Sequence, residues 1–431
     1  MEKIIKKIYT QTMGCRLNQS ESAVIENSLA VNGFEVVDSY AQADIVVVNT
    51  CTVTENGDAD TRRLVNKIVR QNPSARIALI GCQAQVQKAK LAELPNVRWV
   101  IGNAKKFNLA EIFRETEHAT IPQIITPTIP REIFTVPIAG IDRSHTRANI
   151  KIQDGCDFFC TFCEIPYARG RARSREFDDI FHEVRALVDA GHKEIVLTGI
   201  NIGTYQASDK SIADVLEILE QVRGLERIRI SSIEPTTIPD AVLTKMAAGG
   251  KLCRYLHVPL QSGHNEILKR MQRKYTLEEF SAFVRDARRQ VTGICIGTDV
   301  IVGFPGETDA HFDATCAAVR ELPIDYCHVF SYSKRYMAKS REFTDEVPAA
   351  VIAKRSEILR DLSNRKRRLF FERSLETIQR VLFEQKKNGV WTGLTDNYIR
   401  IHVESHQNLR NQLRDVRLSR IERENVYGEI V

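Results

Sequence analysis

The sequence lacks any apolar run that approaches the ~20 residues a helix needs to cross a membrane. Its N-terminus, MEKIIKKIYT, is basic, but Lys6 and Lys7 interrupt the apolar residues that a signal peptide would need to keep together. We therefore expect a cytoplasmic protein that does not interact with a membrane.

The dense cysteine spacing of a small secreted scaffold is also absent, although the chain contains ten cysteines. In a reducing compartment such cysteines are metal ligands, catalytic groups or core residues rather than disulfide partners. A strong excess of one charge is lacking too, since the net charge is +6 over 431 residues. This charge permits a polyanionic partner without requiring one.

What is present is a chain long enough for two or three domains with cores of their own. Residues 1–125 alternate strand and helix patterns, which is typical of an open α/β sheet. Buried strands are predicted at Ile8–Thr10, Ile45–Asn49 and Ile77–Ile80, and helices at Ser20–Asn32 and Asp58–Gln71. The stretch from Glu117 to Asp142 is rich in Pro, Ile and Thr, and we place a linker at residues 126–142.

Residues 143–371 repeat the alternation about six times and predict a (β/α)6 partial barrel. Its strands are expected at Ile150–Gln153, Glu194–Thr198, Arg227–Ser231, Tyr255–Pro259, Ile294–Val302 and Tyr326–Ser331. Helices are expected between them, at Phe177–Ala190, Ile212–Val222 and Leu277–Arg289. The charged segment Ala349–Glu372 has apolar positions at helical spacing and predicts a connecting helix.

Residues 372–431 change character and predict a small antiparallel β-barrel of five strands, similar to an OB-fold. The strands are expected at Thr377–Glu384, Val390–Leu394, Tyr398–Val403, Leu413–Ile421 and Val426–Val431. Asn388-Gly389 is a strong hairpin signal between the first two.

Three cysteines, Cys156, Cys160 and Cys163, form a C-x-x-x-C-x-x-C motif just past the first strand of the predicted barrel. A β/α barrel collects its active-site residues at this end of its strands. Iron–sulfur clusters normally use four thiolates, so a compact set of three predicts a cluster with one iron open to another ligand. The alternatives are a zinc site completed by a distant His, and unrelated core cysteines.

Three more cysteines, Cys15, Cys51 and Cys82, each follow a predicted strand of the N-terminal sheet. The carboxyl ends of parallel strands line one crevice, so these thiols are expected to converge and could hold a second three-cysteine cluster. The alternative is that a small, frequently buried residue ends three strands by chance. Cys253, Cys295, Cys316 and Cys327 have no ligand spacing, and we expect them to be buried core residues.

Over essentially its full length the chain resembles the radical SAM methylthiotransferases, whose domains are an N-terminal cluster domain, a radical SAM barrel and a C-terminal TRAM domain. The matching motifs are QTMGCRLNQSES, NTCTVTENGDADTRR, GCQAQ, KIQDGCDFFCTFCEIPYARGRARSR, LTGINIG, RISSIEP, HVPLQSGHNEILKRMQRKYT and GTDVIVGFPGET. NTCTVT followed by DADTRR resembles the branch that modifies threonylcarbamoyladenosine in tRNA. Other branches modify isopentenyladenosine in tRNA or an aspartate of a ribosomal protein, and these stay alternatives, as does a non-enzymatic RNA-binding protein that holds zinc.

The resemblance implies two 4Fe-4S clusters and two molecules of S-adenosylmethionine (SAM). One SAM would methylate sulfur at the cluster held by Cys15, Cys51 and Cys82. The other would be cleaved at the Cys156, Cys160 and Cys163 cluster to a radical that removes hydrogen from carbon 2 of the adenine at tRNA position 37. Such chemistry is carried by the cofactors, while the protein positions and shields it.

The resemblance also implies the residues that contact SAM and the partners of the protein. The SAM contacts would be Gly199, Asn201, Ser232, Glu234, Gln261 and Asp299, all at or near predicted strand ends. The partners would be the anticodon loop of tRNA and an electron donor such as flavodoxin or ferredoxin. Locally, Asn201 could instead cap a helix, and Glu234 could be a solvated turn residue.

Two arginine-rich segments are candidates for RNA contacts. Arg169, Arg171, Arg173 and Arg175 recur at every second residue, so an extended segment would place them in a row that follows phosphates. The cluster Arg365, Lys366, Arg367 and Arg368 could extend this surface. The alternative is that these side chains pair with acidic neighbours or are solvated.

The sequence departs from the family pattern in two places. Glu164 follows Cys163 where the family usually has an aliphatic residue, so it either points to solvent or tunes the cluster site. The segment at 332–342 lacks the Pro and Gly that relatives carry near 334–338, and we expect it to face the substrate.

Overall fold

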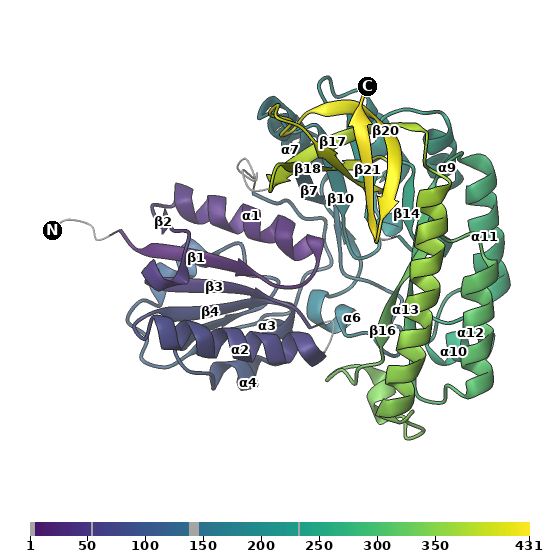
Figure 1. Ribbon diagram of the computed structural model, residues 1–431. Coiled ribbons are helices and arrows are strands. Elements are labelled where there is room, and N and C mark those ends of the chain that lie inside the picture. Colours follow the sequence, from purple (N-terminus) through teal and green to yellow (C-terminus); the bar gives the residue numbers. More distant parts are fainter. Residues whose placement is uncertain (1–4, 53–54, 138–145, 232) are drawn as a thin grey trace.

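The computed structural model describes residues 5–52, 55–137, 146–231 and 233–431. Its N-terminal part is a parallel sheet with the strand order β2-β1-β3-β4-β5-β6 (Figure 1). The strands are β1 (Lys7–Thr12), β2 (Glu35–Val36), β3 (Ile45–Thr50), β4 (Arg76–Gly81), β5 (Val97–Ile101) and β6 (Gln123–Ile125). The open α/β sheet is therefore confirmed, with β2, β5 and β6 added to the predicted strands.

Helices cover both faces of this sheet, because successive side chains of its strands point to opposite sides. The helices are α1 (Arg16–Val31), α2 (Glu55–Gln71), α3 (Cys82–Val86), α4 (Lys88–Ala92) and α5 (Leu109–Glu115). Val47 packs with α1 and α5 on one face, whereas Val46 and Val48 pack with α2 on the other. Figure 1 shows α1 and α2 on opposite sides of the sheet.

The central part contains two parallel three-stranded sheets, β7-β10-β13 and β14-β15-β16. Their strands are β7 (Arg147–Lys151), β10 (Glu194–Thr198), β13 (Arg227–Ile230), β14 (Tyr255–His257), β15 (Cys295–Val302) and β16 (Tyr326–Ser331). A bridge between Ile228 and Leu252 links the two sheets. Within the described ranges β7 and β16 do not pair, so the six strands do not close into a ring. The central part is therefore a partial barrel, as the sequence predicts.

Helices surround the partial barrel and bury their apolar faces against its strands. They are α7 (Phe177–Asp189), α8 (Ile212–Glu220), α9 (Asp240–Ala247), α10 (Asn265–Arg270), α11 (Leu277–Gln290) and α12 (Asp309–Glu321). The predicted connecting helix, α13 (Ala349–Glu372), lies beside β16, where the Ser363 hydroxyl bonds the backbone of Cys327. Shorter elements are β8 (Gln153–Asp154), α6 (Ile165–Arg169), β9 (Arg173–Ser174), β11 (Gln206–Ala207) and β12 (Lys210–Ser211).

The C-terminal part is a closed barrel with the order β17-β18-β19-β21-β20. Its strands are β17 (Ile378–Lys387), β18 (Val390–Thr395), β19 (Arg400–Glu404), β20 (Leu413–Glu422) and β21 (Asn425–Ile430). The hairpin at Asn388-Gly389 is confirmed, since both residues have positive φ as a two-residue turn requires. The β19–β21 pair is parallel, so the barrel is not antiparallel throughout as predicted.

Arginines of the central barrel anchor this C-terminal barrel. Arg229 is fully buried and donates to the carbonyls of Thr395 and Asp396 at 3.0 and 2.8 Å. Arg227 donates to the carbonyl of Leu394 at 2.8 Å, and Arg254 pairs with the Asp396 carboxylate. The two barrels are therefore joined by buried, charge-assisted hydrogen bonds.

Several expectations need correction or stay untested. The Pro-rich stretch from Glu117 to Asp142 contains β6, which pairs with β5 at the edge of the N-terminal sheet, just before the linker placed at 126–142. Within that linker Phe134 forms an isolated bridge with Arg175. The helix predicted from Ser20 begins at Arg16, because its first two turns bury Leu17 together with polar residues such as Asn18 and Glu21, which give no apolar period. The domain boundaries at 125, 142 and 371 stay predictions. Among the described residues, no helix is both long and apolar enough to cross a membrane.

Candidate iron–sulfur and SAM site

The structure brings the three N-terminal cysteines to one edge of the parallel sheet. Cys15 precedes α1, Cys51 directly follows β3, and Cys82 begins α3 at the end of β4. Asn18 ties these ends together, because its amide donates to the carbonyls of Met13 and Thr50 at 2.8 and 3.1 Å. Adjacent parallel strands thus end in a set of three thiols, as the topology predicts.

Two glycines allow this close approach. Gly14 has φ +89, and a Cβ there would lie 2.6 Å from the Cys51 Sγ. Gly81 has φ +93, and a Cβ there would lie 2.5 Å from the Asn49 Oδ1. Both positions need a residue without a side chain and with access to positive φ. The glycines in TMGC and LIGC therefore position Cys15 and Cys82.

The second set, Cys156, Cys160 and Cys163, lies in the loop between β8 and α6. The Phe158 backbone donates to the Cys156 sulfur at 3.5 Å, and the Ile165 backbone donates to the Cys163 sulfur at 3.4 Å. At Gly155, with φ +70, a Cβ would lie 2.1 Å from the Arg171 carbonyl oxygen, so the loop folds tightly on itself.

An arginine that the sequence does not single out completes this second set. Arg273 donates to the Cys160 sulfur at 3.1 Å and pairs with Glu234. Its position after α10, 110 residues from the motif in sequence, gives no local signal of this contact.

Both sets fit an iron–sulfur cluster with one open iron. Each provides three thiols and donors aimed at sulfur, which is the environment that tunes such clusters. Burial raises the pKa of Cys156 to about 11 and also raises the pKa of Cys163. These thiols therefore keep their protons at neutral pH until a metal displaces them.

The described residues expected to contact SAM follow the carboxyl ends of β10, β13 and β14, except Asp299, which lies within β15. Glu234 is joined to the second set by Arg273. Asn201 and Gln261 are nearly buried, yet the Asn201 Nδ2 and the Gln261 Oε1 have no hydrogen-bond partner among the described residues. Buried polar atoms are normally satisfied, so these two are free for a polar ligand. Ser232 lies outside the described residues.

The other expected SAM contacts are constrained by their neighbours. Gly199 lies where a Cβ would be 2.6 Å from Ile202. Burial raises the pKa of Glu234, although Arg273 opposes this shift. Asp299 accepts from His257 at 2.8 Å and faces His328 at 3.5 Å. Burial acts to raise the pKa of Asp299, but the two histidines lower it below its ordinary value.

The predicted row of RNA-binding arginines is wrong. Arg169 ends helix α6, and Arg169 and Arg175 are fully buried in ion pairs. Arg173 is largely buried against Asp154, so only Arg171 is substantially exposed, and it pairs with Asp157. The spacing suggested one extended strand, but β9 contains only Arg173 and Ser174.

The second basic cluster is spread around helix α13. Arg365 lines a groove, and Lys366 donates to the carbonyls of Arg320 and Leu322. Arg367 lies over the Tyr326 ring, and Arg368 pairs with Glu372. Helical geometry thus separates four residues that are consecutive in sequence.

Glu164 does not point to solvent. It is buried, accepts from the Thr52 hydroxyl at 2.6 Å and accepts from the Met337 backbone at 2.8 Å. Arg335 lies 3.6 Å from it and pairs with Asp58 at 2.8 Å. Glu164 and the segment at 332–342, the two departures from the family pattern, are therefore in contact. Because Glu164 follows Cys163 and bonds Thr52, which follows Cys51, this contact links the segment to the loops of both cysteine sets. The remaining four cysteines are buried, as predicted.

A partial β/α barrel with three cysteines at the carboxyl ends of its strands, next to a sheet that ends in three more, defines a radical SAM enzyme with a second cluster site. The model of the Radical SAM superfamily matches residues 150–319, and the model described as Uncharacterized protein family UPF0004 matches residues 7–102. The chain belongs to the radical SAM methylthiotransferase family. These sulfur-transferring enzymes use SAM and two 4Fe-4S clusters.

Relatives match nearly the whole chain. Threonylcarbamoyladenosine tRNA methylthiotransferase MtaB of Bacillus subtilis is 37% identical, over 94% of this chain and 92% of that protein. The protein of the same name from Aquifex aeolicus is 35% identical, over 95% and 99%. A tRNA-2-methylthio-N(6)-dimethylallyladenosine synthase of Thermodesulfovibrio yellowstonii is 31% identical, over 99% of both.

Among solved structures, the radical SAM methyltransferase TsrM of Kitasatospora setae superposes with a TM-score of 0.57 at 18% identity. The match covers 75% of this chain and 73% of TsrM, and it shows a shared fold.

Proposed function

We propose that this chain adds a methylthio group to carbon 2 of N6-threonylcarbamoyladenosine at position 37 of tRNA. The observation that carries the proposal is that the six cysteines form two sets, both at carboxyl ends of parallel strands and joined by buried contacts. Three relatives at 35–37% identity carry the name of this activity.

We assign a different step of the reaction to each cysteine set. When bound, the clusters and SAM supply the methylthio sulfur and the radical that removes hydrogen from carbon 2. Cys15, Cys51 and Cys82 hold the sulfur-bearing cluster, and Cys156, Cys160 and Cys163 hold the cluster that cleaves SAM. The protein orients the two sites and excludes water between them.

We assign SAM binding to Gly199, Asn201, Glu234, Gln261 and Asp299, with Ser232 as a further expected contact. The unpartnered amide nitrogen of Asn201 suits a carboxylate or ribose oxygen of SAM, and the Gln261 oxygen suits an amino group. At Gly199 the absence of a side chain lets Ile202 and Gln153 pack against the strand end.

The target base fits a cavity of about 180 Å³ beside the central cysteine set. Its lining is Phe162, Gln261, Asp299, Ile301, Phe330, Ser331, Tyr332, Ser333 and Arg335. Phe330 is an exposed aromatic side chain, of the kind on which splayed RNA bases stack.

A basic groove of about 860 Å³ between α13 and the C-terminal barrel is suited to RNA phosphates. Its cations are Arg254, Arg288, Arg320, Arg365, Lys366 and Arg373, against one carboxylate, Asp325. The groove lies at the amino ends of β14, β15 and β16, opposite the base cavity, so it would hold a part of the tRNA away from the modified base. Arg171 is the remaining candidate beside the central cysteine set.

The proposed reaction requires a low-potential electron donor, and we assign this role to a flavodoxin or ferredoxin. We place the activity in the cytoplasm, where the tRNA substrate is found.

Two measurements test the proposal. Nucleoside mass spectrometry of tRNA from a deletion strain should show that methylthio-threonylcarbamoyladenosine is lost. Its unchanged presence, with loss of the isopentenyladenosine derivative, would reassign the substrate to the second branch. Anaerobic reconstitution should give about eight iron and eight sulfide per chain. Zinc without iron would show instead a non-enzymatic RNA-binding protein.

A further inference from the structure

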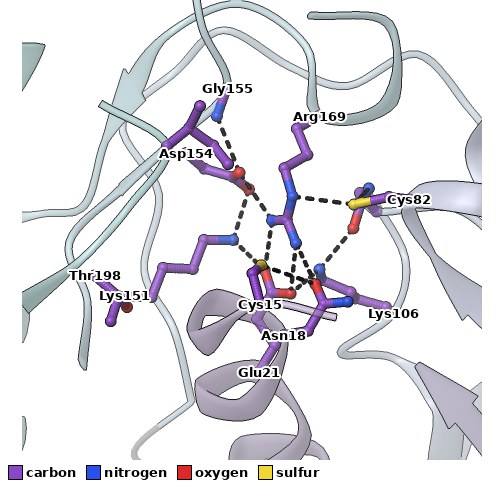
Figure 2. Close-up of polar contacts among 12 residues, drawn as sticks. Cys15, Asn18, Glu21, Cys82, Lys106, Lys151, Asp154, Gly155, Arg169 and Thr198 are labelled. Atoms are coloured by element: carbon purple, nitrogen blue, oxygen red, sulfur yellow. Dashed lines mark hydrogen bonds and ion pairs between the residues drawn. The ribbon is translucent and has the colours of Figure 1, made fainter. Parts of the chain in front are cut away.

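A buried network of charges joins Cys82 of the N-terminal set to Asp154 and Gly155, which directly precede Cys156 of the central set (Figure 2). Arg169, at the end of α6, is fully buried and uses all three of its nitrogen atoms. The Nε donates to the Cys82 Sγ at 3.1 Å, and the Nη1 donates to Glu21 and Asp154, both at 3.0 Å. The Nη2 donates to the Asn18 Oδ1 at 2.6 Å.

The same network reaches the loop of the central cysteine set. Asp154 accepts from the Gly155 backbone at 2.9 Å, directly before Cys156, and pairs with Lys151 at 2.6 Å. Figure 2 shows Arg169 with Cys82 on one side and Asp154 on the other. One guanidinium thus contacts a sulfur of the N-terminal set and the backbone support of the central set.

The network has more positive than negative charges. Arg169, Lys106, Lys151 and Arg173 face Glu21 and Asp154. The Arg173 side chain is 9% exposed, and each of the others is at most 3% exposed. An uncompensated charge is costly in a buried site. The groups placed to compensate it are the adjacent cysteine sulfurs, which become anionic when they bind metal.

We infer that Arg169 is a positioning residue of the N-terminal cluster site, contributed by the central part of the chain. Its hydrogen bond to the Cys82 sulfur and its charge raise the reduction potential of the cluster that Cys15, Cys51 and Cys82 would hold. Hydrogen bonds to sulfur and net charge are established determinants of such potentials. The inference depends on the clusters and not on which nucleoside is modified.

The test isolates the N-terminal cluster in a chain whose Cys156, Cys160 and Cys163 are replaced by Ala. Arg169→Lys keeps the charge, but one ammonium group cannot replace three nitrogens that reach Cys82, Asn18 and two carboxylates. After anaerobic reconstitution, iron and sulfide per chain are measured, and the potential is determined by redox titration followed by electron paramagnetic resonance.

A matched control is Arg175→Lys. Arg175 is equally buried and pairs with Asp179 and Glu183, but none of its recorded hydrogen bonds or ion pairs involves a cysteine. Arg169→Lys should lower the potential of the N-terminal cluster relative to Arg175→Lys. In a chain that lacks Cys15, Cys51 and Cys82 instead, Arg169→Lys should shift the potential of the central cluster by less than it shifts that of the N-terminal cluster, because Arg169 reaches the central set only through Asp154 and the Gly155 backbone.

A second variant tests the sign of the electrostatic effect. Glu21→Gln is nearly isosteric and removes one negative charge, so the potential should rise. Loss of iron in Arg169→Lys alone, with an unchanged circular dichroism spectrum, would also support the inference. Equal potentials in Arg169→Lys and Arg175→Lys, or equal loss of iron in both, would overturn it.

Discussion

At the scale of single residues, glycines determine whether the N-terminal cysteines can meet. Gly81 has a positive φ, and a Cβ at this position would lie only 2.5 Å from the Asn49 Oδ1. Gly81→Ala should lower the free energy of unfolding by about 1–3 kcal/mol and reduce the iron bound by the N-terminal set, because Cys82 must shift. Urea unfolding and iron analysis measure both effects.

Gly33→Ala is the matched control, because Gly33 also has positive φ but no atom within 4 Å of an added Cβ. Gly33→Ala should lower the free energy of unfolding, because Ala is strained at positive φ, but the N-terminal cysteine set should bind its full amount of iron. If both variants bound equally little iron, the contact at Gly81 would not position Cys82.

The two cysteine sets should separate in function when one ligand of each is removed. Cys156→Ala should abolish reductive cleavage of SAM, because the open iron that binds SAM is lost with the central cluster. Cys15→Ala should retain cleavage and block methylthiolation. The products 5′-deoxyadenosine and methylthiolated nucleoside are quantified separately by chromatography, and normal methylthiolation by either variant would contradict the assigned roles.

At the scale of elements, long apolar runs were sufficient to predict the main strands, since strands buried on both faces have near-continuous apolar sequence. The two-residue strands and the start of α1 were not predictable in this way. Their positions depend on tertiary partners. In α1, for example, Glu21 accepts from Arg169, which lies 148 residues away in sequence. The arginine row failed because all four arginines pair with carboxylates, from Asp179 four residues after Arg175 to Glu21 148 residues before Arg169, and the spacing of the arginines reports none of these pairs.

The segment at 332–342 also depends on a distant partner, Glu164. Glu164→Gln removes the charge beside Arg335 and weakens the bonds to Thr52 and Met337. The free energy of unfolding should fall by about 1–3 kcal/mol, and the KM for tRNA should rise because the segment borders the base cavity. Glu342→Gln, an exposed change in the same segment, should leave both values unchanged; a similar rise in KM there would contradict the role of Glu164.

At the scale of the whole molecule, the C-terminal barrel depends on buried arginines for its attachment. Arg229→Met should cost about 3–5 kcal/mol of stability, because it leaves the Glu194 carboxylate buried without its main partner. It should also increase proteolysis between α13 and β17. The double variant Glu194→Gln, Arg229→Met should be more stable than the single one, since the Glu194 carboxylate is no longer buried without Arg229; an equal or larger loss would contradict this account.

The same pair makes the stability of the molecule depend on pH. Burial acts to raise the pKa of Glu194, but Arg229, Arg227 and Arg147 outweigh it, so the pKa lies below its ordinary value. A carboxylate whose pKa is lower in the folded than in the unfolded chain stabilises the fold above the unfolded-state pKa of about 4.3, and this contribution is lost as the pH falls through the folded-state pKa. The stability difference between the native chain and Glu194→Gln should therefore be constant from pH 8 to about 5 and shrink below about 4. Urea unfolding at each pH measures it, and a difference that grew on acidification would show that Glu194 is not held as the charged partner of these arginines.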